Sequence, residues 1–289
     1  MLLSMVAVST AAPPSLPLAG TTFSLVGPGR VGTSLAAWLE ASGARGTARA
    51  RRRDLPSLST VGQDLLLIAV PDPVLQEVAA ELARRPQAAV ALHTSGSLDA
   101  SALLPLREKG SAVGSLHPLK AFPRPLEEPS QAKGVFFAVD GDPLAQALAR
   151  RLVTAWGGTS AEVAPETRAL YHFAATLAAG GVVTLLALAE DLAHRLELPE
   201  AAVRGYLELC RGAVAQVLDS GSPVTALTGP AARGDRDTVA RQLNALGDLA
   251  PEKLPLAREL ACETLRQKER NEPLTQAQRE LLEFLEAAG

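Results

Sequence analysis

Histidine residues mark the places where this sequence could move protons. The chain contains four histidines, and His172 lies four residues before Thr176 on a predicted helix. Residues at this spacing share one helical face. Histidine titrates near neutral pH and can act as a general acid or base. We therefore predict that His172 donates a proton and that Thr176 contacts the substrate. The alternative for His172 is a hydrogen-bonded core histidine, and His194 is expected at the surface.

Two further histidines end predicted strands and are followed by polar residues. His93 precedes Thr94 and Ser95, and His117 lies three residues before Lys120. Ligands of parallel α/β sheets bind beyond the carboxyl ends of the strands. We expect Ser95 and His117 to orient a substrate and Lys120 to hold its carboxylate. The alternative is that both histidines only bond backbone groups at the strand ends.

The spacing of the histidines and cysteines gives little support for a metal site or a disulfide. A site made of three histidines is conceivable, but the chain has no HxH or HxxxH pattern, so no metal is predicted. Cys210 and Cys262 lie far apart without CxxC spacing. This excludes a disulfide scaffold and a zinc finger, and it favours a reducing cytoplasm.

A glycine-rich hexapeptide follows the first predicted strand. It reads Gly27-Pro28-Gly29-Arg30-Val31-Gly32, which fits GxGxxG, and it opens an apolar-periodic helix. In a strand–turn–helix context this motif binds dinucleotides, because the second glycine lets the pyrophosphate approach and the helix N-terminus holds it. The alternative is a glycine-rich turn without a ligand.

The end of the second predicted strand indicates which dinucleotide binds. A residue about 20 positions after the motif usually contacts the adenosine ribose. Here that region holds Arg51, Arg52 and Arg53, followed by Asp54. Because arginine pairs well with phosphate, the cluster favours the 2′-phosphate of NADP(H). The alternative is a solvated charge run in which Asp54 binds NAD.

The elements that must position these residues alternate between strand and helix in the first half of the chain. We predict strands at 22–26, 47–51, 64–70, 88–92, 112–116 and 134–139, with helices at 31–41, 74–84 and 143–156. This rhythm predicts an α/β fold with a doubly wound parallel sheet. After residue 161 only helices are predicted, at 165–196, 199–220, 235–246, 251–269 and 275–287. We therefore expect an extension at 1–20, a Rossmann domain at 21–160 and a helical domain at 161–289.

Two apolar stretches raise the question of a membrane. Residues 169–189 contain no Asp, Glu, Lys or Arg, but the stretch includes a Gly-Gly pair and acidic residues follow it directly. We favour a buried helix over a membrane span. The apolar residues 1–8 have no preceding Lys or Arg, so an N-terminal extension is favoured over a signal peptide.

Composition excludes other classes of protein. The 289 residues are 47% hydrophobic, with a net charge of −3 and only 3% aromatic residues. A strongly basic or aromatic-rich nucleic-acid binder is therefore excluded.

The motifs together resemble a family of NADP-linked oxidoreductases that combine a Rossmann-like domain with a helical domain of unknown function. The resemblance places the chain near pyrroline-5-carboxylate reductase and ketopantoate reductase, in the 6-phosphogluconate dehydrogenase-like superfamily. The motifs that carry it are GPGRVG (27–32), DLLLIAVPD (64–72), HTSGS (93–97), SLHPLKAF (115–122), YHFAA (171–175) and LTGPAARGD (227–235).

The resemblance implies further contacts and a homodimer. NADP would lie between the glycine turn, the turn formed by Val70, Pro71 and Asp72, and the pair Thr94-Ser95. The dimer would form through intertwined long helices. Relatives often carry Asn where this chain has Gly180-Gly181, and His where it has Gln242.

These observations predict hydride transfer between NADPH and a small, anionic carbonyl or imine compound. Arg233, in a turn-rich loop that opens a helix, is a second candidate for holding the substrate carboxylate. The alternative for this loop is a purely structural role. The alternative for the whole protein is an NADP-binding sensor or scaffold without turnover, which the missing Asn favours.

Overall fold

The computed structural model describes residues 17–287, and it divides the chain into two units between Gly180 and Gly181. Most of the predicted extension at 1–20 lies outside the described residues. The sequence predicts a boundary near residue 160, but the division falls later. Side chains from the first half of the long helix contact the sheet, so that half groups with the first unit.

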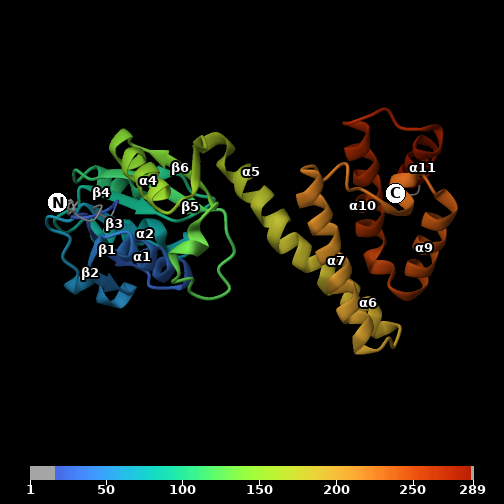
Figure 1. The fold of residues 1–289 in the computed structure, drawn as a ribbon, viewed down its shortest axis with the longest axis horizontal. Coiled ribbons are helices and arrows are strands. Elements are labelled where there is room, and N and C mark those ends of the chain that lie inside the picture. The colour runs from blue at the N-terminus through green and yellow to red at the C-terminus, as the bar shows by residue number, and fades with distance from the viewer. Residues whose placement is uncertain (1–16, 288–289) are drawn as a thin grey trace, which may run out of the picture. The chain divides into compact units, whose positions relative to one another are not determined.

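The first unit is built on a seven-stranded sheet in the order β2-β1-β3-β4-β5-β6-β7 (Figure 1). The strands are β1 (Thr22–Val26), β2 (Arg45–Ala50), β3 (Leu65–Ile68), β4 (Val90–His93), β5 (Ala112–Pro118), β6 (Phe136–Gly141) and β7 (Thr159–Glu162). The pairs among β1 to β5 are all parallel. The predicted α/β class with a largely parallel sheet is confirmed.

The far edge of the sheet departs from the predicted parallel arrangement. β6 pairs with β5 in the antiparallel direction, and β7 then pairs with β6 in parallel. Between β5 and β6 the chain forms a loop with a single short 3₁₀ helix (Pro129–Ala132), so no crossover helix carries it back to the start of the sheet. The strand β7 is absent from the prediction because its sequence, TSAE, is polar and largely exposed.

The sheet is buried on both faces, as its apolar strands predict. In β3, Leu65 and Leu67 belong to the core shared with α1 (Arg30–Ala41) and α4 (Pro143–Ala155). Leu66 and Ile68 belong to the opposite core, shared with α2 (Asp72–Leu82) and with the short helical segments Ala100–Leu103 and α3 (Leu104–Arg107). Because β3, β4 and β5 are parallel neighbours, their carboxyl ends meet at one edge, where α2 and the turns after β4 and β5 begin.

A long helix follows β7, as predicted. Residues Pro165–Arg195 are helical throughout: α5 (Pro165–Thr176), a π-helical segment (Leu177–Gly181) and α6 (Val182–Arg195). Of the described residues, this is the one helix whose length and composition would suffice to cross a membrane. The sequence predicts that it is buried, but none of its most apolar 18-residue window is buried within a single chain.

The second unit is helical. α6 packs against α7 (Glu200–Ser220), and the remaining helices are α8 (Gly229–Arg233), α9 (Arg236–Leu249), the 3₁₀ segment Pro251–Lys253, α10 (Leu254–Glu269) and α11 (Gln276–Ala287). Its small core contains Val239, Cys262, Leu265 and Leu281. After β7, the described residues of the predicted helical domain, up to 287, are thus mainly helical.

Candidate active site

In the glycine turn after β1, the backbone conformation and packing require glycine at two positions but not at the third. Gly27 has a φ of +88°, and a Cβ there would lie 2.4 Å from the Ala69 carbonyl oxygen. A Cβ on Gly32 would lie 2.3 Å from the Gly27 carbonyl oxygen. Gly29, in contrast, has a φ of −81°, and its Cβ would meet nothing within 4 Å.

The N-terminus of α1 is free to bind an anion. Gly29 is its N-cap residue and forms no side-chain capping hydrogen bond, and the first turn carries no acidic residue. The open space at Gly29 adjoins these backbone N–H groups. A pyrophosphate fits this arrangement, because helix N-termini bind phosphate through N–H groups and the helix dipole.

A cavity of about 490 Å³ lies beside the glycine turn. It is lined by residues of the turn, of the segments after two strands and of α2: Gly27, Pro28, Gly29, Arg51, Arg52, Ala69, Val70, Pro71, Val74 and Val78. Arg30 donates to the Pro123 carbonyl oxygen at 3.4 Å, and Val31 packs against the core of the sheet. The cavity therefore joins the predicted glycine turn, Arg51 and Arg52 after β2, and the Val70-Pro71 turn, but not Arg30 or Val31.

The three predicted arginines have different surroundings. Arg52 forms an ion pair with Glu77 of α2, and Arg53 lies 3.6 Å from Asp54 with 77% of its side chain exposed. Within residues 17–287, the Arg51 guanidinium has no ion-pair partner. Arg51 is thus the arginine best placed to receive an added phosphate, and Arg53 does not line the cavity.

Asp72 and Ser95 take part in turn structure. The Ser97 hydroxyl donates to the Asp72 carboxylate at 2.5 Å, which links the start of α2 to the turn after β4. The Ser95 hydroxyl accepts the backbone N–H groups of Ser97 and Leu98 at 3.2 and 3.0 Å, and Ser95 is buried. Neither Thr94, Ser95 nor Asp72 lines the cavity at the glycine turn.

His93 is a structural residue, as the alternative interpretation predicts. Its Nδ1 accepts the Ser95 N–H at 3.2 Å, so its Nε2 carries the proton and donates to the Asp99 carbonyl oxygen at 2.9 Å. Burial lowers the pKa of His93 to about 4. The ring is fully buried and holds the turn after β4 in shape.

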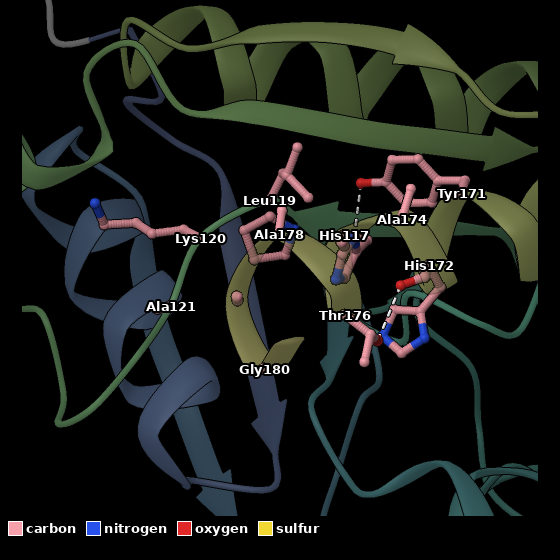
Figure 2. A pocket seen from close by; sticks show the side chains of 13 residues that line it. His117, Leu119, Lys120, Ala121, Tyr171, His172, Ala174, Thr176, Ala178 and Gly180 are labelled. Carbon is pink, nitrogen blue, oxygen red and sulfur yellow. Dashed lines mark hydrogen bonds between the residues drawn. The ribbon is translucent and has the colours of Figure 1, made fainter. Parts of the chain in front are cut away.

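His117, His172 and a tyrosine form a cluster at the end of β5 (Figure 2). His117 Nδ1 and the Tyr171 hydroxyl share a hydrogen bond of 2.9 Å. The His172 ring lies edge-on to the His117 ring, with centroids 5.8 Å apart. A Cβ on Gly96 would lie 2.4 Å from His172 Cδ2 and 2.7 Å from His117 Nε2, so any side chain at this position would displace the rings from where they lie.

Burial sets the charge state of this cluster. It lowers the pKa of His117 to about 4, with further lowering from His172 and Arg168 nearby. It also raises the pKa of Tyr171. At neutral pH His117 and Tyr171 are therefore an uncharged, hydrogen-bonded pair.

Arg168 anchors α5 to the sheet. Its guanidinium is 1% exposed, pairs with Asp140 of β6 at 3.1 Å and donates to the Ser95 carbonyl oxygen at 3.1 Å. Asp140 also accepts the backbone N–H of Ser115 in β5. Because residues three and four apart share a helical face, this anchor turns Tyr171 and His172 toward the end of β5.

A second cavity, of about 630 Å³, opens beside the histidine–tyrosine cluster. It is lined by the loop after β5 and one side of the long helix: His117, Pro118, Leu119, Lys120, Ala121, Tyr171, His172, Ala174, Ala175, Thr176, Ala178, Ala179 and Gly180. All of these residues belong to the first unit. Lys120 is the only lysine or arginine among them, and none is acidic.

Four of the predicted catalytic and substrate residues line this second cavity, namely His117, Lys120, His172 and Thr176. The Thr176 hydroxyl donates to the His172 carbonyl oxygen at 3.1 Å within the helix. Ser95 lies outside the cavity lining, and Arg233 lies in α8 of the second unit, so its role stays a prediction. Between residues 17 and 287, no three His, Cys, Asp or Glu side chains gather as a metal site.

Tyr171 and Arg168 were not singled out from the sequence as functional residues. Tyr171 stands inside the YHFAA motif, next to His172, and Arg168 lies one turn earlier. The spacing of 168, 171, 172 and 175 is a helical face, which is a signal for a shared partner surface. Their hydrogen-bond partners His117 and Ser95 lie 54 and 73 positions earlier in the chain, and the ion-pair partner Asp140 comes from a third element, β6.

Comparisons with sequence families agree with this arrangement. Residues 15–118 match a Rossmann-like domain, and residues 135–264 match a domain of unknown function, DUF2520. The chain thus combines a Rossmann-like domain with a DUF2520 domain, which confirms the resemblance drawn from its motifs. A comparison with curated protein sequences found no significant match.

Solved structures share the fold at low sequence identity. Protein TM1727 from Thermotoga maritima is 21% identical with a TM-score of 0.67, covering 86% of this chain and 99% of that one. A putative NADP oxidoreductase from Bacteroides fragilis is 21% identical with a TM-score of 0.69, covering 86% and 98%. The pyrroline carboxylate reductase of Plasmodium falciparum, with NADP bound, is 14% identical with a TM-score of 0.54, covering 86% and 97%. At these identities the likeness establishes the fold.

Proposed function

We propose that this protein is an NADP(H)-dependent oxidoreductase that transfers hydride to or from a small, anionic carbonyl or imine compound. The observation that carries this proposal is the glycine turn. Gly29 is not required by the backbone conformation or packing of the chain, yet it leaves open the space beside an uncapped helix N-terminus. A bound pyrophosphate accounts for a glycine at this position.

The arginines favour NADP(H) over NAD(H) in this proposal. Arg51 and Arg52 line the cavity beside the glycine turn, and Arg51 has no ion pair within the described chain. An unpaired guanidinium suits a 2′-phosphate, to which it can donate two parallel hydrogen bonds. Two of the similar structures are described as an NADP oxidoreductase and as a reductase with NADP bound, which supports the same cofactor.

The second cavity would hold the substrate. Bound NADPH would supply a hydride to the carbon of a carbonyl or imine group. As the hydride adds to carbon, the oxygen or nitrogen of the double bond gains an electron pair, and His172 donates a proton to that atom. His117, kept uncharged and fixed by Tyr171, orients this atom, and Lys120 pairs with the substrate carboxylate. The Ser95 hydroxyl, which accepts two N–H groups of its own turn, positions the loop that faces both histidines.

Titration of NADPH and NADH into the full chain tests this proposal. NADPH should bind more tightly, and Arg51→Gln should remove most of the preference, because one charge-assisted hydrogen bond contributes about 1.5–3 kcal/mol. Arg53→Gln is the matched control, since Arg53 lies outside the cavity. Equal affinities for the two cofactors in the wild-type protein would refute the NADP assignment.

A non-catalytic NADP-binding sensor is the second candidate. The resemblance to the family favours it, because that resemblance implies an Asn on the long helix where this chain has Gly180 and Gly181, and Gly180 lines the second cavity. Under this alternative NADPH binds tightly, but no 2-oxo acid or cyclic imine oxidises it. Turnover assays on such compounds separate the two candidates.

A further inference from the structure

We propose that Gly96 is a positioning residue of the active site, because the lack of a side chain there lets the rings of His117 and His172 lie against the turn after β4. This inference rests on the oxidoreductase function proposed above, in which both histidines act on the substrate. Gly96 lines neither of the two cavities described above, so it acts only through the two rings. Three features carry the inference: the contacts at Gly96, its backbone conformation and the way in which α5 holds the turn.

The contacts at Gly96 come from the two histidine rings. The three heavy atoms nearest to a Cβ built at this position are His172 Cδ2 at 2.4 Å, His117 Nε2 at 2.7 Å and His117 Cε1 at 2.9 Å. Carbon atoms that are not bonded to each other pack at about 3.5–4.0 Å, so a Cβ would push both rings aside. The rings also contact each other edge-on, with centroids 5.8 Å apart. Gly96 therefore supports the pair as a unit.

The backbone conformation of Gly96 does not itself require glycine. Its φ lies outside the left-handed region, unlike that of Gly27, whose φ is +88°. An alanine can therefore follow the same backbone path without the strain that the left-handed region imposes on residues with a Cβ. The steric requirement for glycine thus comes from the histidine rings that lie against this residue.

Helix α5 contacts the turn at two points on one of its faces. The Arg168 guanidinium donates to the Ser95 carbonyl oxygen at 3.1 Å and pairs with Asp140 of β6, so the peptide group between Ser95 and Gly96 is held in place. His172 follows Arg168 by four residues, which puts both on the same helical face, and its ring lies against Gly96. Because Arg168 fixes the helix to the turn, a Cβ at residue 96 would displace the ring rather than the helix.

The position of the two rings decides whether they can act on a substrate. His117 is held at Nδ1 by the Tyr171 hydroxyl, 2.9 Å away, and its opposite edge lies against Gly96. A displaced His172 ring still binds a proton but no longer directs it at the substrate. Misplacing a reacting group by about 1 Å can lower a rate about 10²-fold. A side chain at residue 96 should therefore impair the reaction more than it impairs folding.

The NMR signals of the histidine rings, recorded on the full chain without substrate, test the inference. In Gly96→Ala we expect the signals of His117 and His172 to move, and the pKa of His117 to rise from about 4 toward its ordinary value, because the displaced ring loses part of its burial. His93, which holds the same turn, is the internal control and should keep its signals. Gly205→Ala, whose Cβ would meet nothing within 4 Å, is the control variant. Unmoved signals of His117 and His172 in Gly96→Ala would overturn the inference.

A second set of variants keeps the test decisive if Gly96→Ala destabilises the fold. In the double variant His117→Ala/His172→Ala both rings are absent, so nothing near residue 96 opposes a Cβ. Gly96→Ala should then shift the melting temperature of this background by no more than about 2 °C, even if it lowers that of the wild-type protein further. A large and equal loss in both backgrounds would show that glycine serves the backbone rather than the rings, and it would overturn the inference.

Turnover measurements distinguish the failure of this inference from that of the proposed function. With NADPH and a panel of 2-oxo acids and cyclic imines, Gly96→Ala should lower kcat about 10²-fold or more, whereas NADPH affinity should change little. If the wild-type protein turns over none of these compounds, the proposed function fails, and the ring signals still decide whether Gly96 positions the histidines. Wild-type kcat in Gly96→Ala, with the rings displaced, would overturn the positioning role and leave the proposed function intact.

Discussion

Two histidines face the same cavity but are held differently. The His117 ring shares a hydrogen bond with the Tyr171 hydroxyl, whereas His172 is held by ring packing against His117 and by its place on α5. A ring fixed by a second side chain suits an orienting role. A ring that is held only by packing can donate its proton to a substrate, which is why the proposed mechanism assigns that step to His172.

Replacement of His172 tests its role as proton donor. His172→Ala should lower kcat about 10²–10⁴-fold, which is the usual contribution of a general acid. NADPH affinity should stay unchanged, because the phosphate contacts are proposed at Gly29 and Arg51. Turnover, NADPH binding and melting temperature are measured together, with the exposed His194→Ala as control. Wild-type turnover in His172→Ala would remove this residue from the mechanism.

The buried histidines predict acid sensitivity. Burial lowers the pKa of both His93 and His117 to about 4 from an ordinary value near 6.5. Between these values the unfolded chain binds more protons than the folded chain, so stability falls as the pH drops through this window. The loss is of the order of 1–3 kcal/mol for each histidine.

Urea unfolding at pH 7 and pH 5 measures this effect. His117→Gln should lose less stability than the wild-type protein between the two pH values, because one of the two buried bases is gone. His194→Gln, which changes an exposed histidine, should keep the wild-type dependence. An unchanged pH dependence in His117→Gln would contradict the lowered pKa.

At the residue scale, the sequence predicts which side chains meet but not what holds them. His117, Lys120, His172 and Thr176 line one cavity, as strand ends and helical spacing indicate. The sequence does not reveal that Tyr171 bonds His117 or that Arg168 pairs with Asp140, because these partners come from elements far apart in the chain. The hydroxyl of Ser95, which we predict to orient the substrate, accepts two backbone N–H groups in its own turn, and the sequence does not reveal these bonds.

At the scale of secondary structure elements, the turn between β1 and α1 gives a matched pair of variants. Gly29→Ala should change the free energy of unfolding by less than about 1 kcal/mol, because its conformation and surroundings admit a Cβ. It should nevertheless weaken NADPH binding about tenfold or more, since the methyl group would occupy the pyrophosphate space. Gly32→Ala should destabilise the fold, because its Cβ would lie 2.3 Å from a carbonyl oxygen.

Thermal unfolding and NADPH titration of both variants check this prediction. Unaltered NADPH affinity in Gly29→Ala would show that the pyrophosphate does not approach this glycine. A fully stable Gly32→Ala would contradict the close packing of α1 on β1.

Strands with strong apolar patterns were predictable, and those that depend on tertiary pairing were not. The run DLLLIAV predicts β3, because a strand covered on both faces is continuously apolar. The polar β7 lacks this signal, and its pairing depends on β6 beside it. The antiparallel direction of β6 follows from the loop connection after β5, which hydrophobic periodicity does not encode.

At the scale of the whole molecule, the long apolar helix exposes large apolar side chains in the single chain. Leu170, Phe173 and Val183 are 70%, 55% and 66% exposed in the single chain. We propose that a second copy of the chain covers this helix, because obligate homodimers bury large apolar interfaces. Light scattering at micromolar concentration should give about twice 30.1 kDa, and Val183→Glu should shift the protein toward a monomer. A stable wild-type monomer in dilute solution would contradict the dimer.

The central claim is that one NADP(H) molecule links the glycine turn to the cavity beside His117 and His172. A crystal structure of the full chain with NADP⁺ tests it most directly. We predict the 2′-phosphate at Arg51, the pyrophosphate at Gly29 and the nicotinamide ring beside His172. A nicotinamide ring placed away from both histidines, or a dinucleotide that leaves the glycine turn empty, would contradict it.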